Sequence, residues 1–251
     1  MANLKGKVVV VTGASKGIGA AIAEKLGAEG AKVVVNYASD KAGAEKVAAN
    51  IKQSGGEAIA VQADISKPAD IKKLFAATTQ AFGPEVNVLV NNAGVYEFRP
   101  LEAVDEAHVR KHFDLNVLGL LLTTQEAVAH MNGNGGNIIN VSSIVSKTPG
   151  PFSSVYSGTK GAVDVISRAL AVELGPRKIR VNTLAPGATY TEGVQEVLKN
   201  APAFSEMAVQ RTPLGRIGTV EDIAKAALFL ASDDSGWITG EELLVGGGIR
   251  L

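Results

Sequence analysis

Short runs of β-branched residues alternate with longer stretches of helical periodicity along the whole chain. The run from Val8 to Val11 is the clearest of them. It has no polar alternation, which is typical of a strand buried on both faces of a parallel sheet. On the same grounds, strands are predicted at 8–11, 32–36, 58–62, 86–90, 137–141, 180–184 and 243–245.

Helices are predicted between these strands, where glycine, proline and capping residues bound stretches of helical period. They begin near Ile18 and at about Pro68, and they span 41–54, 105–130, 154–174 and 219–232. Parallel strands joined by helices must be connected by right-handed crossovers. We therefore predict an α/β fold, a Rossmann-type doubly wound sheet of seven parallel strands with helices on both faces, as a single domain over 1–251.

Small and polar residues follow the predicted strands at the points where the strands end. In such a sheet the carboxyl ends of the strands meet at one edge, and ligands bind there. Loops are polar in general, so any one of these segments alone would mean little. Together they predict a ligand site, and they are 12–19, 37–39, 64–65, 91–94, 142–146 and 186–191.

The first of these segments has the features of a phosphate-binding turn. Gly13, Gly17 and Gly19 allow positive φ and close backbone approach, and the helix that opens near Ile18 presents unpaired N–H groups. A pyrophosphate is the natural occupant of such a helix N-terminus. The spacing G-x-x-x-G-x-G differs from the commonest dinucleotide fingerprint, so this segment alone leaves a bare turn without a ligand open.

Composition narrows the choice of partners. The 251 residues carry 25 Lys and Arg against 25 Asp and Glu, with no long run of either sign, which argues against nucleic acid or an anionic membrane. The absence of cysteine excludes disulfides and thiolate chemistry. No apolar run approaches the roughly 18 residues of a membrane span, and the first strand begins too early for a signal peptide. We expect a cytoplasmic protein with small neutral partners.

A serine, a tyrosine and a lysine form the candidate catalytic group. Ser143 follows the fifth strand, and Tyr156 and Lys160 lie four residues apart on the next helix, so their side chains share a face. A phenol has a reference pKa of about 10, and a neighbouring ammonium would lower that pKa. Ser143 could then hold a substrate oxygen by a hydrogen bond. A tyrosine and a lysine at this spacing can also be only a surface pair that stabilises a helix.

Six motifs occur along the chain: TGASKGIG at 12–19, NNAG at 91–94, Leu115-Asn116-Val117, Ser143, YSGTK at 156–160 and Pro186-Gly187. This joint pattern covers essentially the whole chain and closely resembles the short-chain dehydrogenase/reductase family. The resemblance implies that Tyr156 is the general acid/base, that Lys160 lowers its pKa and binds the nicotinamide ribose, and that Ser143 orients the carbonyl or alcohol. It also implies that Asn116 holds a water that links Lys160 to solvent.

The resemblance also implies a cofactor site. Asp64 and Ile65 would contact the adenine, and the segment 92–94 would line the site. The segment 186–191 would cover the nicotinamide, with Thr189 as a partner of the carboxamide. The expected cofactor-binding residues are Gly13, Ser15, Lys16, Gly17, Ile18, Gly19, Tyr37, Ser39, Asp64, Ile65, Asn92, Ala93, Gly94, Tyr156, Lys160, Pro186, Gly187, Thr189 and Thr191.

The cofactor is expected to be NADP(H) rather than NAD(H). In dinucleotide folds an acid about 20 residues past the glycines accepts a hydrogen bond from the adenine ribose 2′-OH, and its charge would repel a 2′-phosphate. The second strand ends at Asn36 and Tyr37 without an acid, and Asp40 is expected to open the next helix and point away. Lys16 and Ser39 are placed to meet the phosphate. The alternative is that Lys16 only solvates an exposed turn.

A metal site is not expected. His108 and His112 are four residues apart, a spacing that zinc sites use on helices. His130 lies far beyond them, about 27 Å from His112 along a continuous helix, so the three cannot share one ion. Because the chain also lacks cysteine, the two histidines are interpreted as part of a solvated helix face.

The predicted activity is hydride transfer between NADP(H) and a ketone or secondary alcohol, with Tyr156 giving or taking the proton. A 3-oxoacyl-carrier-protein reductase and a glucose-like sugar dehydrogenase share these motifs and stay open as alternatives. A non-catalytic nucleotide-binding sensor is the alternative from another class. The complete set of Asn116, Ser143, Tyr156 and Lys160 argues against a sensor.

Substrate choice is expected to depend on the variable loops 95–101, 145–154 and 188–212. The last of these contains Gly193 and Pro202 with only short apolar stretches, which predicts a mobile lid of one or two short helices. A homotetramer is a further implication of the resemblance. Apolar residues on more than one face of the helices at 105–130 and 154–174 favour it.

Overall fold

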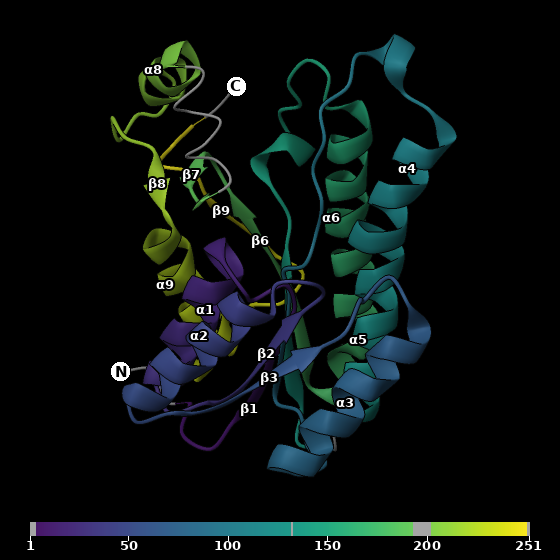
Figure 1. Cartoon of the computed structure of the whole chain (residues 1–251), viewed down its shortest axis with the longest axis vertical. Coiled ribbons are helices and arrows are strands. Elements are labelled where there is room, and N and C mark those ends of the chain that lie inside the picture. Colours follow the sequence, from purple (N-terminus) through teal and green to yellow (C-terminus); the bar gives the residue numbers. More distant parts are fainter. Residues whose placement is uncertain (1–3, 132, 193–201, 250–251) are drawn as a thin grey trace.

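A seven-stranded parallel sheet forms the centre of the molecule, in the order β3-β2-β1-β4-β5-β6-β9 (Figure 1). The computed structural model describes residues 4–131, 133–192 and 202–249. The strand order reverses between β1 and β4, which leaves a crevice at their carboxyl ends. The strands are β1 (Val8–Val11), β2 (Lys32–Tyr37), β3 (Glu57–Gln62), β4 (Val88–Asn91), β5 (Gly136–Val141), β6 (Ile179–Pro186) and β9 (Glu242–Val245).

Helices cover both faces of this sheet (Figure 1). The first face carries α1 (Gly17–Ala28), α2 (Lys41–Gln53) and α9 (Val220–Ala231). The opposite face carries α3 (Pro68–Phe82), α5 (Leu120–Ala129) and α6 (Ser154–Leu174), with α4 (Glu106–Phe113) beside α6. The predicted Rossmann-type fold is confirmed.

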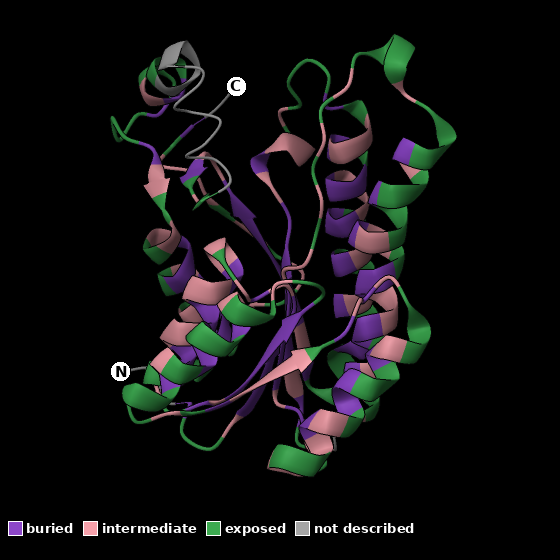
Figure 2. Cartoon of the chain, in the orientation of Figure 1, coloured by how far each residue is buried: buried purple, intermediate pink, exposed green. Residues whose placement is uncertain are grey.

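Strand β1 shows how the sequence builds two cores. Val9 and Val11 pack among the residues under α1, α2 and α9, whereas Val8 and Val10 pack under α3, α5 and α6. Because successive side chains of a strand point to opposite faces, a run of four valines supplies both cores at once. Figure 2 shows the resulting pattern, with burial concentrated in the sheet and on the inner faces of the helices.

The structure departs from the predicted elements in one helix and adds one small sheet. The expected helix at 105–130 is divided: α4 is followed by a π-helical segment, η2 (Asp114–Gly119), and then by α5. At Gly119 a Cβ would lie 2.8 Å from the carbonyl oxygen of Ile65, so this wider turn packs closely on the loop after β3. The second difference is a small parallel sheet of β7 (Thr189–Tyr190) and β8 (Gly218–Thr219). Two-residue strands are too short to leave a pattern.

The segment expected to form a lid contains β7 and one short helix, α8 (Pro202–Gln210). Residues 193–201, which belong to the same prediction, lie outside the described residues. The mobility of the segment therefore stays a prediction.

Short 3-10 turns complete the described chain at η1 (Leu101–Ala103), η3 (Ile144–Ser146), η4 (Gly175–Arg177) and η5 (Asp233–Ser235). Within the described ranges, no helix is both long and apolar enough to cross a bilayer.

Candidate active site

A cleft of about 350 Å³ opens at the carboxyl edge of the sheet, between the start of α1 and the loop that follows β4. It lies where the strand order reverses, which is the position at which doubly wound sheets bind ligands. Three of the six segments that were expected to converge contribute residues to it: 12–19, 91–94 and 186–191. Its lining residues are Lys16, Gly17, Ile18, Gly94, Val95, Tyr96, Glu97, Lys111, Thr191 and Glu192.

The glycine turn is fitted closely against the loop after β4. A Cβ on Gly13 would lie 2.8 Å from Ala93 Cα, and one on Gly19 would lie 2.4 Å from Asn92 Nδ2. Asn92 Nδ2 donates hydrogen bonds to the carbonyls of Thr12 (3.0 Å) and Gly13 (2.9 Å). Glycine is therefore required here for packing between the two loops, and Asn92 joins them.

The N-terminus of α1 has no side-chain cap of its own, and Glu192 Oε2 lies 3.7 Å from where a Cβ on Gly17 would be. Lys16 is the residue before the helix, its side chain makes no capping hydrogen bond, and the first turn contains no acid. Gly17 follows with a φ of +60°, which a residue with a Cβ would adopt only under strain. Backbone N–H groups at such a helix start favour phosphate, so the residues present fit the pyrophosphate of a dinucleotide.

The end of β2 is built around Asn36, a residue that the sequence analysis did not assign to the site. Its Oδ1 accepts a hydrogen bond from Gly13 N (3.2 Å), and its Nδ2 donates to Ala63 O (3.0 Å). Tyr37 is buried in the core, whereas Ser39 is exposed. Asp40 caps α2, because its carboxylate accepts from Gly43 N (3.0 Å), so its expected position at the helix start is confirmed.

Tyr156 and Lys160 lie on the first turns of α6, which spans the predicted range. Burial raises the pKa of the Tyr156 phenol, whereas its side-chain contact with Ser143 lowers that pKa. Lys160 Nζ donates to Val141 O (2.8 Å) and lies 5.8 Å from the centre of the Tyr156 ring. Burial lowers the pKa of Lys160 to about 8, and the carboxylate of Asp164 opposes that shift. Lys160 is not among the groups that shift the pKa of Tyr156 in this structure, so its expected effect on that pKa stays a prediction.

Asn116 lies in the π-helical turn and points at the same centre. Its Oδ1 accepts from Val95 N (2.9 Å), and its Nδ2 donates to Val95 O (2.9 Å) and to Thr159 Oγ1 (3.1 Å). A Cβ on Gly94 would lie 3.1 Å from Asn116 Oδ1 and 3.8 Å from Lys160 Nζ. Gly94, Asn116 and Lys160 therefore meet, and a side chain at position 94 would press on Asn116 Oδ1.

Other predicted residues follow the ends of β6 and β3. Gly187 N donates to Val245 O (2.9 Å) directly after Pro186 ends β6, and Thr189 Oγ1 donates to Gly187 O (2.9 Å). Asp64 accepts hydrogen bonds from the N–H (3.0 Å) and hydroxyl (2.7 Å) of Ser66. The Ser66 contacts hold the pKa of the Asp64 carboxyl below its usual range. Ile65 is buried under the sheet.

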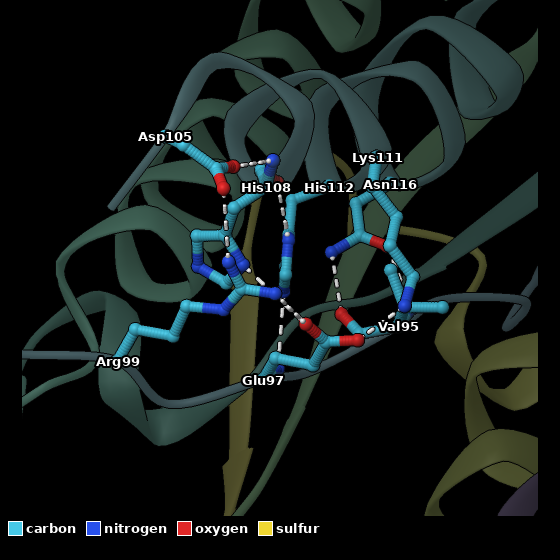
Figure 3. A network of polar contacts seen from close by, with 8 residues as sticks. All are labelled: Val95, Glu97, Arg99, Asp105, His108, Lys111, His112 and Asn116. Carbon is cyan, nitrogen blue, oxygen red and sulfur yellow. Dashed lines mark hydrogen bonds and ion pairs between the residues drawn. The ribbon is translucent and has the colours of Figure 1, made fainter. Parts of the chain in front are cut away.

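The two histidines of α4 are buried, so the prediction that they form a solvated helix face is wrong. His112 Nε2 accepts a hydrogen bond from Glu97 N (3.0 Å), and its Nδ1 contacts His108 O (2.8 Å) (Figure 3). The Glu97 carboxylate contacts Lys111 and Arg99 and lies 3.4 Å from His108 Nδ1. The histidines thus hold the loop after β4. Among the described residues, no group of three or more metal-binding side chains converges.

Comparisons with known proteins agree with this geometry. The family model described as Enoyl-(Acyl carrier protein) reductase matches residues 13–250. An uncharacterized oxidoreductase of Methylorubrum extorquens is 55% identical over 250 residues, which cover 100% of both chains. Versicolorin reductase 1 of Aspergillus parasiticus is 42% identical over 256 residues, covering 98% of this chain and 97% of the other. The solved structure of the angucycline C-6 ketoreductase LanV with bound NADP has a TM-score of 0.93 at 37% identity, covering 99% and 97% of the two chains.

The fold and the cleft define a dinucleotide-type α/β oxidoreductase. The chain belongs to the short-chain dehydrogenase/reductase family, close to versicolorin reductases and ketoreductases.

Proposed function

We propose that this protein is an NADP(H)-dependent carbonyl reductase that interconverts a ketone and a secondary alcohol. The observation that carries the proposal is the meeting of Tyr156, Ser143 and Lys160 beside the glycine-lined cleft. The motifs fit a 3-oxoacyl-carrier-protein reductase and a glucose-like dehydrogenase as well, so these remain alternative activities of the same site.

The protein's own groups would handle the proton. NADPH, when bound, supplies a hydride to the carbonyl carbon. Ser143 holds the carbonyl oxygen, and the Tyr156 hydroxyl gives its proton to that oxygen, so the products are the alcohol, NADP⁺ and a tyrosinate that regains a proton from water. Burial raises the pKa of Tyr156, so the hydroxyl carries its proton at neutral pH, and transfer of that proton depends on the basicity that the substrate oxygen gains as the hydride arrives.

Lys160 and Asn116 support this step from behind the tyrosine. A lysine whose pKa is lowered to about 8 can exchange a proton near neutrality, which a relay from solvent to Tyr156 requires. Asn116 fixes the loop that bears Gly94 and Val95 beside the lysine. The family role of Asn116, holding a water for that relay, is part of the proposal.

The cofactor preference is proposed from charge. The exposed loop after β2 has Ser39 but no free acid, because Asp40 is engaged as the cap of α2. Lys16 is exposed at the mouth of the glycine turn and lines the cleft. A 2′-phosphate would therefore meet one cation and one hydroxyl rather than a carboxylate.

A substrate panel tests the function. NADPH and NADH oxidation would be followed by absorbance with aryl ketones, α- and β-keto esters, acetoacetyl thioesters and aldoses. The proposal expects the highest kcat/KM for a ketone with NADPH. A clear preference for the thioester or for aldose oxidation would select one of the alternatives. Tight cofactor binding with no turnover on any of these would identify a sensor.

The proposal extends to the domain organisation, a lid and the assembly of the chain. The chain would act as a single domain, with residues 188–212 as a lid over the cleft, and it would assemble as a homotetramer. The exposed valines of α6, Val165 (58%) and Val172 (81%), lie seven residues apart on one helix face, and Leu118 (45%) is exposed on η2. A monomeric mass by light scattering at micromolar concentration would exclude the tetramer. Equal proteolysis of 188–212 with and without NADPH would exclude the lid.

A further inference from the structure

Two aromatic rings of the loop after β4 stand beside the candidate catalytic tyrosine. The ring of Phe98 lies 6.1 Å from that of Tyr156 and meets it edge-on at 86°. The ring of Tyr96 also lies 6.1 Å from that of Tyr156, tilted by 55°. Both rings leave much of their surface uncovered, since Tyr96 is 50% and Phe98 is 56% exposed. Aromatic rings at such distances and angles attract one another, and their free faces can take another ring.

Contacts between Glu97 and α4 hold the loop that carries these two rings. Glu97, between them in sequence, turns its carboxylate toward α4, where it contacts Lys111 and lies within 3.4 Å of His108 Nδ1 (Figure 3). Its backbone N–H is bound by the buried ring of His112. The loop is thus anchored through Glu97, and this fixes the position of Tyr96 and Phe98 before any ligand arrives. Because Tyr96 and Phe98 are already held in position, they lose little conformational freedom when a ligand binds.

A second loop lies next to the loop that carries Tyr96 and Phe98. Phe152, which precedes α6, is 62% exposed, and its carbonyl accepts a hydrogen bond from Arg99 N (2.9 Å). Its φ is +64°, a conformation that a bulky side chain rarely adopts. Such strain persists only where the surrounding structure imposes it, and it is concentrated at functional sites. The hydrogen bond between Arg99 N and Phe152 O therefore joins this strained, exposed residue to the loop that carries Tyr96 and Phe98.

The charges near the rings are already satisfied by one another. Arg99 contacts Glu97 (3.2 Å) and Asp105 (3.4 Å), and Lys111 contacts Glu97. The Lys111 contact holds the pKa of Glu97 at about 2, so the carboxylate stays charged and paired throughout the neutral range. Neither cation is left to bind an anionic substrate. The chemistry of this surface favours a flat, uncharged, aromatic ligand.

We propose that Tyr96 and Phe98 form an aromatic wall that selects a neutral ketone fused to an aromatic ring, and orients its carbonyl toward Ser143 and Tyr156. The inference rests on the proposed carbonyl reduction. Tyr96 also lines the cofactor cleft, so the wall is continuous with the place where the hydride would be delivered.

Three ketones with similar unconjugated carbonyls test the wall: 2-tetralone, which carries a fused benzene ring, trans-2-decalone, its saturated counterpart, and cyclohexanone. With NADPH, kcat/KM is expected to be at least about 10-fold higher for 2-tetralone than for trans-2-decalone, since two rings contribute. Phe98→Leu and Tyr96→Leu keep an apolar side chain and should each lower that ratio by about 3- to 10-fold. Because both rings contact Tyr156, the readout for these variants is the ratio between the two bicyclic ketones and not the turnover of cyclohexanone.

The matched control is Phe229→Leu, which removes an exposed aromatic ring on α9 and should not change the ratio. A wild-type ratio close to one, or a ratio that both wall variants leave intact, would overturn the wall while the carbonyl reduction stands. Turnover of cyclohexanone that survives Tyr156→Phe would instead overturn the proposed function. If a wall variant fails to fold, the wild-type ratio between 2-tetralone and trans-2-decalone decides the question alone.

Discussion

Asn116 binds both backbone groups of Val95: its amide oxygen accepts the N–H and its amide nitrogen donates to the carbonyl, each at 2.9 Å. An asparagine side chain that pairs with a peptide in this way substitutes for a neighbouring strand. The pair fastens the loop after β4 to the π-helical turn, within reach of Thr159 on α6. One side chain therefore joins three segments of the chain around Lys160.

Asn116→Ala is expected to lower both stability and turnover. The change removes two hydrogen bonds to the part-buried N–H and carbonyl of Val95, which together contribute about 1 to 3 kcal/mol of unfolding free energy. Denaturant unfolding and kcat would measure the two effects. The control is Asn50→Ala on α2, where one contact with Glu24 (2.7 Å) is lost far from the cleft and kcat should not change. A stability loss without any loss of kcat would argue against a positioning role.

Tyr156→Phe is expected to keep NADPH binding and to lower kcat by about 10² to 10⁴-fold. The ring still packs against Tyr96 and Phe98, but the transferable proton is gone. NADPH fluorescence would report binding, and absorbance decay would report turnover. A variant with most of its kcat would falsify the assignment of Tyr156 as the acid.

Stability is expected to rise with pH in the window that belongs to Lys160. Burial lowers the pKa of this lysine in the folded protein to about 8 from its ordinary value of 10.5. Between these two values the unfolded chain binds more protons than the folded one, so the free energy of unfolding increases as the pH rises. Denaturant unfolding of the wild type and of Lys160→Met at pH 7.5 to 10 would isolate this contribution, because the variant lacks it. If the free energy of unfolding changed with pH in the same way for both proteins, the lowered pKa of Lys160 would be refuted.

Lys16→Ala is expected to raise KM for NADPH by roughly tenfold, which corresponds to about 1.4 kcal/mol, with little change for NADH. Lys41→Ala is the matched control, since Lys41 is an exposed lysine at the start of α2 that pairs with Glu45 (3.6 Å). A wild-type kcat/KM that is higher with NADH would reverse the proposed preference.

Ser39→Asp is expected to shift preference toward NADH, because it places a carboxylate in the exposed loop after β2. Tyr37→Asp is a poorer test of the same idea, since Tyr37 is buried in the core and a charge there would destabilise the fold. The ratio of kcat/KM values for the two cofactors measures the shift. No change in that ratio would place the adenine ribose elsewhere.

Strongly patterned parts of the chain could be predicted from the sequence. The β-branched runs around Val8 to Val11 permit little except a buried parallel strand, and α6 has the predicted bounds because its apolar period is continuous from Ser154 to Leu174. The structure also brings Ser143, Tyr156 and Lys160 together at the expected edge of the sheet. Their catalytic and binding roles stay proposals.

Other parts of the site depend on contacts that leave no local pattern. His108 and His112 have the spacing of a polar helix face, but the Glu97 loop folds over them and buries both. Asn36 resembles any polar residue at a strand end, yet it joins the glycine turn to the loop after β3. In each case the partner is distant in sequence, so one chain without its tertiary contacts gives no signal.

The π-helical turn at Asp114–Gly119 makes the active centre sensitive to the number of residues as well as to their identity. Each residue of an α-helix advances the side-chain direction by about 100°. Removing one residue from this turn would restore a regular α-helix, and every side chain on one side of the deletion would rotate by that angle relative to the other side. Asn116 would then leave Val95, although no functional side chain had been replaced. Deleting one residue from this turn is therefore expected to abolish activity. Most single substitutions at neighbouring exposed positions are not expected to do so.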